Sequence, residues 1–222
     1  KMVEYLSSVS LADLVKQQEG RAHVHGVRES KIKIEAPKSA KASTANTKKE
    51  TVKEAIGHLP KITPLSEAKH ENGKNISHLS TDTTDKLHSP RFHNHRDVSI
   101  FKYWVANNMN SMKSVEKIKF YNDLTGKKSN HGKYRNLEWG KPSPTVVAHL
   151  HKDGLMFIHP DAEQARSITV REAALLQSFP KDYEFIGSQG TCYKMIGNAV
   201  PPKMAKGIAN GIFEVLTRKK KK

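Results

Sequence analysis

Large apolar residues are unevenly distributed along this chain, and this limits where a folded core can form. Residues 34–53 contain no aromatic side chain and almost no large aliphatic one. Such a segment buries too little apolar surface to offset the conformational entropy that it loses on ordering. We therefore interpret residues 1–50 as an N-terminal segment and flexible linker, in which residues 3–15 have enough Leu, Val and Tyr for one short helix or strand. Convincing compact structure is expected only after about residue 91.

Several later segments have patterns typical of regular structure. Residues 98–105 (VSIFKYWV) have the β-branched and aromatic content of a buried segment. Residues 144–150 and 155–158, separated by a turn at 152–154, predict a β-hairpin. Residues 62–90 are polar, and Glu71-Asn72-Gly73 is interpreted as part of a polar loop. Residues 114–124 predict an amphipathic helix whose core side would carry Val115, Ile118, Phe120 and Tyr121.

Two helices are predicted near the end of the chain. Thr169 and Glu172 have the spacing of a capping box, and an apolar run follows them until Pro180, which is expected to end the helix. Pro201-Pro202 is placed where proline is tolerated, at the start of a second helix. Apolar residues then follow at helical spacing up to the basic tail 218–222, namely Met204, Ile208, Ile212 and Val215.

The charge of the chain indicates a polyanionic partner, with nucleic acid as the first candidate. The 222 residues include 38 Lys+Arg and 22 Asp+Glu, a formal net charge of +16. Residues 91–222 hold 23 of the basic and 11 of the acidic side chains. No apolar run reaches the roughly 18 residues needed to cross a bilayer and no signal peptide is recognised. We expect a cytoplasmic protein, nucleoid-associated if it is prokaryotic.

Three further features could carry chemistry, but their ordinary interpretation is favoured. The pairs His93/His95 and His149/His151 have a spacing that puts both side chains on one strand face, yet no cysteine or carboxylate completes a ligand set, so no metal site is predicted. Cys192 is the only cysteine, which excludes an internal disulfide, and it has no pattern of an activated thiolate. The basic tail is interpreted as a solvated terminus, with a non-specific phosphate contact as the alternative.

The most specific pattern lies in residues 166–202. It begins with RSITVREAALLQSFP (166–180), continues through Tyr183, Phe185 and Gly187, and ends with IGNAVPP (196–202). The two runs resemble motifs IX and X of the DNA (cytosine-5) methyltransferases, in that family's order and separation. Leu175 is a departure, since the family often carries arginine there. Residues 134–146, 159–160 and 51–60 resemble further family elements, so the resemblance covers about 51–217.

The resemblance implies a mixed α/β fold in two functional parts. Residues 51–190 would form a small, β-rich target-recognition domain that includes the motif IX helix. Residues 191–222 would carry motif X, a C-terminal helix and the basic tail. This second part would dock on a catalytic domain and complete a Rossmann-like methyltransferase domain supplied by a partner.

The resemblance also implies roles for individual residues. Thr145 is expected to contact the DNA backbone, and further groove or phosphate contacts are expected from Arg135, Lys133 and Lys141. Four motif IX residues are expected to be structural, through buried charge-assisted hydrogen bonds: Arg166, Arg171, Glu172 and Gln177. Motif X is expected at the entrance to a helix, lining the S-adenosylmethionine pocket with Asn198, Ala199 and Val200.

Three elements that methyl transfer requires are absent from these 222 residues. They are a glycine-rich strand–turn–helix for S-adenosylmethionine, a Pro-Cys loop whose thiolate adds to C6 of cytosine, and a Glu-Asn-Val element. No catalytic residue is therefore assigned. We expect the DNA-recognition subunit of a two-chain methyltransferase, with double-stranded DNA and a catalytic subunit as partners. The alternatives are an inactive methyltransferase remnant and a basic DNA-binding protein with no methyltransferase partner.

Overall fold

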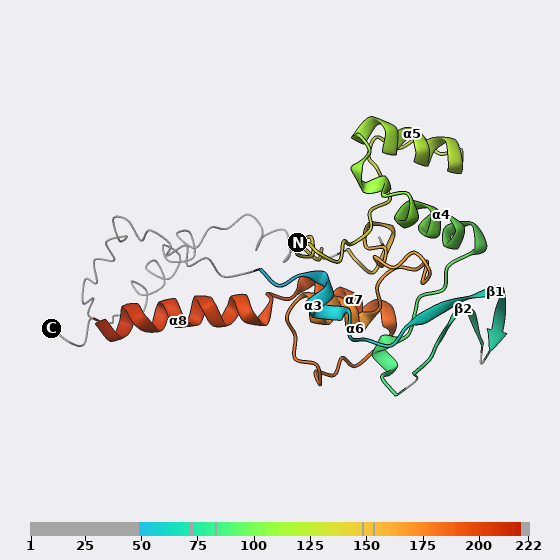
Figure 1. Ribbon diagram of the computed structural model, residues 1–222. Coiled ribbons are helices and arrows are strands. Elements are labelled where there is room, and N and C mark those ends of the chain that lie inside the picture. The colour runs from blue at the N-terminus through green and yellow to red at the C-terminus, as the bar shows by residue number, and fades with distance from the viewer. Residues whose placement is uncertain (1–48, 72, 83, 148, 153, 219–222) are drawn as a thin grey trace, which may run out of the picture. The chain divides into compact units, whose positions relative to one another are not determined.

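The computed structural model describes residues 49–71, 73–82, 84–147, 149–152 and 154–218 (Figure 1). Residues 1–48, with the segment 3–15, and residues 219–222 of the tail lie outside the described residues. The described part combines helices with one small antiparallel sheet, as the mixed fold class predicts. The longer elements are α3 (Val52–Ile56), β1 (Ile62–Glu71), β2 (Lys74–Ser80), α4 (His95–Ala106), α5 (Ser114–Thr125), α6 (Val170–Leu176), α7 (Gln189–Asn198) and α8 (Pro202–Arg218). Short 3-10 helices lie at Lys86–His88 (η1), Met109–Ser111 (η2) and Gly154–Met156 (η3).

The two strands form a hairpin in the segment interpreted as polar. β1 pairs antiparallel with β2, and the register runs from Ile62 opposite Ser80 to Glu71 opposite Lys74. Gly73, between the strands, has φ 75°, a backbone conformation that glycine adopts without steric cost. The loop interpretation therefore holds for Gly73, which lies in the turn, whereas Glu71 ends β1 and the two flanking strands were not predicted.

The segment 98–105 lies within the helix α4. The side-chain oxygen of Asn94 caps this helix by accepting a hydrogen bond from the backbone N–H of Asp97 at 2.8 Å. Ile100, Phe101 and Trp104 are buried, at the spacing of one helical face. They form a second core with Met109, Tyr134, Ile158 and Ala165.

The helix predicted over 114–124 is confirmed as α5, but it lies at the edge of the second core and has no fully buried residue. Ile118, Phe120 and Tyr121 are partly buried. Val115 is 77% exposed, so its expected place in the core was wrong. α5 thus packs through aromatic contacts on one side, where Phe120 and Tyr121 meet Tyr103, Trp104 and Tyr134.

The β-hairpin expected over 144–158 was wrong. No described residue of 144–152 belongs to a strand, and 154–156 form η3. Val146, Leu150 and Phe157 are nevertheless buried in the first core, so their apolar pattern reflects burial in an irregular segment. Ile158 makes two isolated β-bridges, with Asn136 and with Ser167.

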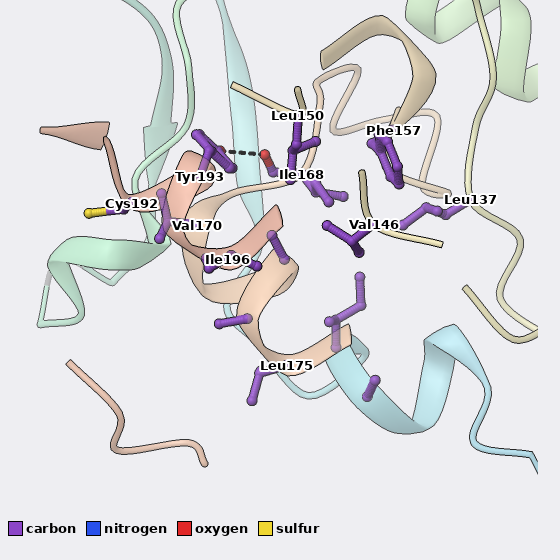
Figure 2. Packing of buried hydrophobic residues seen from close by; sticks show 14 of the residues in the cluster. Leu137, Val146, Leu150, Phe157, Ile168, Val170, Leu175, Cys192, Tyr193 and Ile196 are labelled. Atoms are coloured by element: carbon purple, nitrogen blue, oxygen red, sulfur yellow. Dashed lines mark hydrogen bonds between the residues drawn. The ribbon is translucent and has the colours of Figure 1, made fainter. Parts of the chain in front are cut away.

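The first core lies between three short helices and the irregular segment. Figure 1 shows α3, α6 and α7 side by side. The hydroxyl of Tyr193 on α7 donates a hydrogen bond to the carbonyl of Ile168 at 2.7 Å (Figure 2). The core contains Val52, Ile56, Leu137, Val146, Leu150, Phe157, Ile168, Val170, Ala173, Ala174, Leu175, Cys192, Tyr193 and Ile196, among others.

The C-terminal helices depart from the predicted pair in two respects. α6 starts at the predicted capping box but ends at Leu176, four residues before Pro180. A helix that was not predicted, α7, follows, and the expected domain boundary between 190 and 191 falls inside it.

α8 begins at Pro202 as predicted. Its apolar residues Met204, Ile208 and Ile212 are 58%, 51% and 57% exposed, and the side chain of Val215 lies outside the description. Among the described helices, none is long and apolar enough to cross a membrane.

Candidate nucleic-acid interface

Three of the four predicted DNA contacts line one cavity. Lys133, Arg135 and Thr145 surround a space of about 220 Å³. Arg135 and Thr145 are exposed, so the cavity is open to solvent. Its remaining walls come from the neighbouring loops and the edge of the first core: His131, Gly132, Pro144, Val147, His149, Met156 and Phe157.

The backbone beneath the cavity is fixed by the two cores. The N–H of Arg135 donates to the carbonyl of Leu155 and its carbonyl accepts from the N–H of Ile158, both at 3.0 Å. Tyr134, on the opposite side of the chain, is buried in the second core, and Leu137 is buried in the first. Because successive residues of an extended segment point to opposite sides, burial of Tyr134 turns Lys133 and Arg135 toward the cavity.

The cavity is positively charged, and among the described residues its two cations, Lys133 and Arg135, form no ion pair. Within the part of the chain that the structure describes, neither Lys133 nor Arg135 has a carboxylate oxygen within 4.0 Å. Lys141 does not line the cavity, and its ammonium group lies 2.5 Å from the carboxylate of Glu138. The structure therefore brings together Lys133, Arg135 and Thr145 and leaves Lys141 apart.

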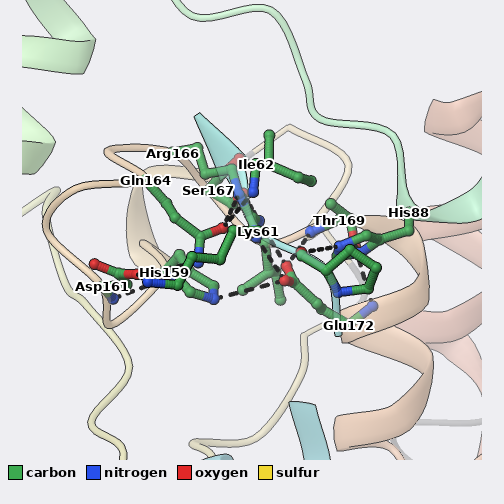
Figure 3. A network of polar contacts seen from close by, with 12 residues as sticks. Lys61, Ile62, His88, His159, Asp161, Gln164, Arg166, Ser167, Thr169 and Glu172 are labelled. Atoms are coloured by element: carbon green, nitrogen blue, oxygen red, sulfur yellow. Dashed lines mark hydrogen bonds and ion pairs between the residues drawn. The ribbon is translucent and has the colours of Figure 1, made fainter. Parts of the chain in front are cut away.

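Motif IX is organised by one buried ion pair. Two nitrogens of the Arg166 guanidinium donate to the two carboxylate oxygens of Glu172, each at 2.7 Å (Figure 3). The amide oxygen of Gln164 accepts two more hydrogen bonds from the same guanidinium, at 2.7 and 3.1 Å. The Glu172 carboxylate also accepts from the N–H of Thr169, its capping-box partner, at 2.7 Å.

The protonation states of this network follow from its surroundings. Burial alone raises the pKa of Glu172, but the adjacent Arg166 charge and its hydrogen bonds outweigh burial and bring the pKa to about 2. His159 lies 3.6 Å from the same carboxylate, yet burial lowers its pKa to about 4, and the Arg166 charge acts in the same direction. Near pH 7 the network therefore holds one cation, one anion and a neutral imidazole.

The other two motif IX residues are also buried and connect α6 to its neighbours. The Nε of Arg171 donates to the carboxylate of Asp85 at 2.5 Å, and an Nη donates to the carbonyl of Tyr183 at 3.0 Å. The amide of Gln177 donates to the carbonyl of Ile196 on α7 at 2.9 Å. These contacts join α6 to Asp85, to the loop that precedes α7 and to α7 itself.

The sequence interpretation did not foresee that histidines near the network are buried. The Nε2 of His93 accepts a hydrogen bond from the backbone N–H of Ser167 at 3.2 Å and lies 3.1 Å from the Ser167 hydroxyl, and the His93 ring contacts Phe101 edge-on. Burial, with the nearby His78, lowers the pKa of His93 to about 3. His95, which was paired with His93 by spacing, is exposed at the start of α4, so the two do not share a face. Among the described residues no group of three or more possible ligands could hold a metal ion.

Motif X lies between the end of α7 and the start of α8, so it precedes a helix as expected, but it also closes the helix before it. Asn198 is the last residue of α7, and the N–H of Ala199 donates to the carbonyl of Ile196 at 3.1 Å. Val200, 58% exposed, precedes α8. The free N–H groups of a helix start are therefore not at Asn198 or Ala199. The exposed Asn198 amide and the Val200 side chain can offer one polar and one apolar contact from an open surface.

Comparison with known proteins identifies relatives over most of the chain. Residues 14–214 match the family model of the C-5 cytosine-specific DNA methylases. Type II methyltransferase M.Bpa9945I of Bacillus paralicheniformis is 44% identical over 103 residues, 43% of this chain and 23% of that protein. Putative type II methyltransferase M.OihORF3336P of Oceanobacillus iheyensis is 35% identical over 205 residues, 73% of this chain and 44% of that protein.

A third relative differs in its size. Type II methyltransferase M.AquIB of Picosynechococcus sp. is 35% identical over 124 residues, which cover 50% of this chain but 86% of that protein. By contrast, the chain spans less than half of the length of M.Bpa9945I and M.OihORF3336P. The family model covers far more than half of the 222 residues and includes the cavity, motif IX and motif X. The chain belongs to the C-5 cytosine-specific DNA methylase family.

Proposed function

We propose that this chain is the DNA-recognition subunit of a two-chain DNA (cytosine-5) methyltransferase. Assembled with a catalytic subunit, it would direct methyl transfer from S-adenosylmethionine to C5 of cytosine in a specific DNA sequence. The observation that carries the recognition role is the convergence of Lys133, Arg135 and Thr145 on one cavity whose cations have no acidic partner in the described chain.

The cavity suits the sugar–phosphate backbone of DNA. Two cations and a hydroxyl on a fixed backbone provide the charge-assisted and neutral hydrogen bonds that phosphate oxygens accept. Lys141 contributes less in this proposal, because its charge is already balanced by Glu138. The motif IX residues Arg166 and Glu172 hold the scaffold and do not touch the DNA.

The chemistry of methyl transfer needs groups that these 222 residues do not contain. The 222 residues contain no Pro-Cys dipeptide, and a family enzyme needs that thiolate to attack the cytosine ring. M.AquIB supports a two-chain arrangement, because an alignment of 124 residues covers 86% of a protein that is itself named a methyltransferase. A chain so short has little room for a complete catalytic domain.

The exposed apolar residues of α8 are the proposed docking surface for the catalytic subunit. Met204, Ile208 and Ile212 recur every four residues and therefore lie on one helical face. Exposed apolar surface of this kind marks an interaction site more often than an ordinary solvated face. In this proposal residues 51–190 form the recognition domain, and the docking part is α8 with motif X.

The cofactor would be shared between the two subunits. S-adenosylmethionine supplies the methyl group when it is bound. Asn198 would hold a polar group of it, and Ala199 and Val200 would border it, as one wall of a site that the partner completes. The exposure of Asn198 and Val200 in this chain supports a wall open toward a partner.

Co-expression with the product of the adjacent reading frame tests the proposal. A partner with a glycine-rich loop and a Pro-Cys element should co-purify with this chain, and the mixture should methylate DNA while neither chain does so alone. If the mixture binds DNA but never methylates it, the chain is an inactive remnant. If the partner methylates DNA equally well without this chain, the chain has no part in the enzyme.

A further inference from the structure

A short loop leads from α5 directly into the cavity. α5 ends at Thr125, and the capping residue Gly126 has φ 65° and donates its N–H to the carbonyl of Asn122 at 2.9 Å. Residues 127–131, which we name the approach loop, then run to Gly132 and Lys133. His131 and Gly132 already line the cavity, so the loop and the cavity form one continuous surface.

The backbone of the approach loop is held by side chains. The amide oxygen of Asn122 accepts from the N–H of Ser129 at 2.8 Å, and its amide nitrogen donates to the carbonyl of Ser129 at 3.3 Å. The hydroxyl of Ser129 donates to the carbonyl of His131 at 2.9 Å. The hydroxyl oxygen of Thr125 accepts from the N–H of Lys127 at 3.3 Å.

The end of the loop is also packed tightly against α5. A Cβ atom at Gly132 would lie 3.2 Å from the Cβ of Lys117, so a larger residue would require Lys117 to shift by a few tenths of an ångström. Lys117 is itself tied down, because its ammonium group donates to the carbonyl of Asn110 at 2.7 Å. The loop thus has a defined path between two glycines.

The side chains of this held loop are left available. Lys127, Lys128, Asn130 and His131 are exposed, and within the described chain none of their side chains has a hydrogen bond or ion pair. No acidic residue lies between Asp123 and Glu138 in the sequence. Because the backbone of this loop is already held at Lys127, Ser129 and His131, less conformational entropy is lost when a partner binds its side chains.

We propose that the approach loop determines sequence specificity, with Asn130 and His131 reading base edges in the major groove of DNA. This inference rests on the proposed recognition function. The amide of Asn130 has one donor and one acceptor side by side, the pattern that pairs with N7 and N6 of adenine. Lys127 and Lys128 contact phosphates beside the groove, and the cavity residues Lys133 and Arg135 fix the register on the backbone.

The two roles leave different experimental signatures, which a paired set of variants separates. The full chain, or its complex with the catalytic subunit where one co-purifies, is used to select from 30-base-pair duplexes with a randomised centre. The variants are N130A/H131A in the loop and K133A/R135A in the cavity. Affinity for the selected duplex and for a scrambled duplex is then measured between 50 and 300 mM salt.

The loop variant should lose discrimination between DNA sequences but keep its affinity for the scrambled duplex. The ratio of selected to scrambled affinity should fall about 5- to 150-fold, the discrimination of one bidentate side chain–base pair. Its salt dependence should stay unchanged. The cavity variant should keep the ratio, and its log–log salt slope should decrease by about two.

Other outcomes decide against one proposal or the other. A loop variant that keeps the wild-type ratio overturns the inference and leaves the recognition function intact. If the wild type selects no sequence and binds both duplexes equally, the proposed recognition function itself fails. N122A serves as the positioning variant, because it keeps the Asn130 side chain but removes the hydrogen bonds that hold the loop at Ser129. It should therefore reduce the ratio of selected to scrambled affinity. N122Q, which restores an amide, should recover part of that ratio.

Discussion

Arg166 and Glu172 form a bidentate ion pair, with two hydrogen bonds of 2.7 Å, in which neither side chain is accessible to solvent by more than 1%. The pair joins the segment before α6 to the first turn of that helix. Its charges balance, but each would be costly alone in this environment.

The first prediction follows from that balance. E172A leaves the Arg166 charge buried without its partner and removes the capping box of α6, so the free energy of unfolding should fall by about 3–5 kcal/mol. Urea unfolding followed by circular dichroism measures the change. K102A is the control: Lys102 pairs with Glu163 at the surface, at 3.0 Å, and its loss should cost about 1 kcal/mol or less. Equal losses in the two variants would contradict the importance given to burial.

The second prediction concerns acid stability. The pKa of His159 is lowered to about 4 and that of His93 to about 3, chiefly by burial, whereas both would titrate near 6.5 when unfolded. Below pH 6.5 the unfolded chain therefore binds protons that the folded chain does not, and stability should decrease as the pH falls toward 4. Glu172 adds to the loss only below about pH 4.5, where its unfolded form protonates.

Unfolding midpoints at pH 7.0, 6.0 and 5.0 measure this dependence. Each histidine contributes a slope of up to about 1.4 kcal/mol per pH unit. H93Q removes one titrating group, so its slope between pH 6 and 5 should be smaller than that of the wild type by up to this amount. An unchanged slope would mean that His93 is not held neutral by the fold.

The third prediction concerns the support beneath the cavity. The side-chain oxygen of Asn110 accepts from the indole N–H of Trp104 at 3.1 Å and from the N–H of Asn136 at 3.2 Å. N110A leaves both donors unsatisfied, which should lower the free energy of unfolding by about 1–3 kcal/mol. The segment that carries Arg135 should also loosen, so DNA affinity should fall although Asn110 does not line the cavity. N110D should not restore either property, because it sets a carboxylate against the carbonyl of Asn136 and the carboxylate of Glu138, which accept from the Asn110 amide at 2.8 and 3.3 Å.

The fourth prediction distinguishes the lysines that were grouped by resemblance. Lys133 lines the cavity without an acidic partner in the described chain, whereas Lys141 pairs with Glu138. K133A should therefore reduce the log–log salt slope of DNA binding by about one. K141A should change the slope by less, because the charge it removes is already balanced. A larger effect of K141A would show that the Glu138 pair opens on binding DNA.

The parts of this fold that were predictable have local signals. The capping box of Thr169 and Glu172 fixes the start of α6, and Pro202 fixes the start of α8. The hairpin of β1 and β2 was missed because its buried positions include Ser77 and His78, which are polar and are satisfied by distant partners. His78 contacts the carbonyl of Gln164, 86 residues away, and no local pattern encodes such a contact.

The expected 144–158 hairpin failed for the opposite reason. Val146, Leu150 and Phe157 are apolar because the first core needs them, and an irregular chain supplies them as well as a strand would. The cavity was predictable in part, since Lys133 and Arg135 are two apart in an extended segment. The meeting of Thr145 with them depends on that irregular segment and required the structure.

The last prediction tests the docking surface of α8. Ile208 is 51% exposed, so I208D should leave the stability of the isolated chain and its DNA binding unchanged. In the assembled enzyme the same change places a carboxylate in an apolar contact and removes a buried side chain worth about 1.5–3 kcal/mol, so affinity for the catalytic subunit should fall at least about 10- to 150-fold. K206A, also on the exposed surface of α8, is the matched control and should not weaken assembly. Calorimetric titration of the two subunits measures both, and equal affinities for I208D and wild type would place the docking surface elsewhere.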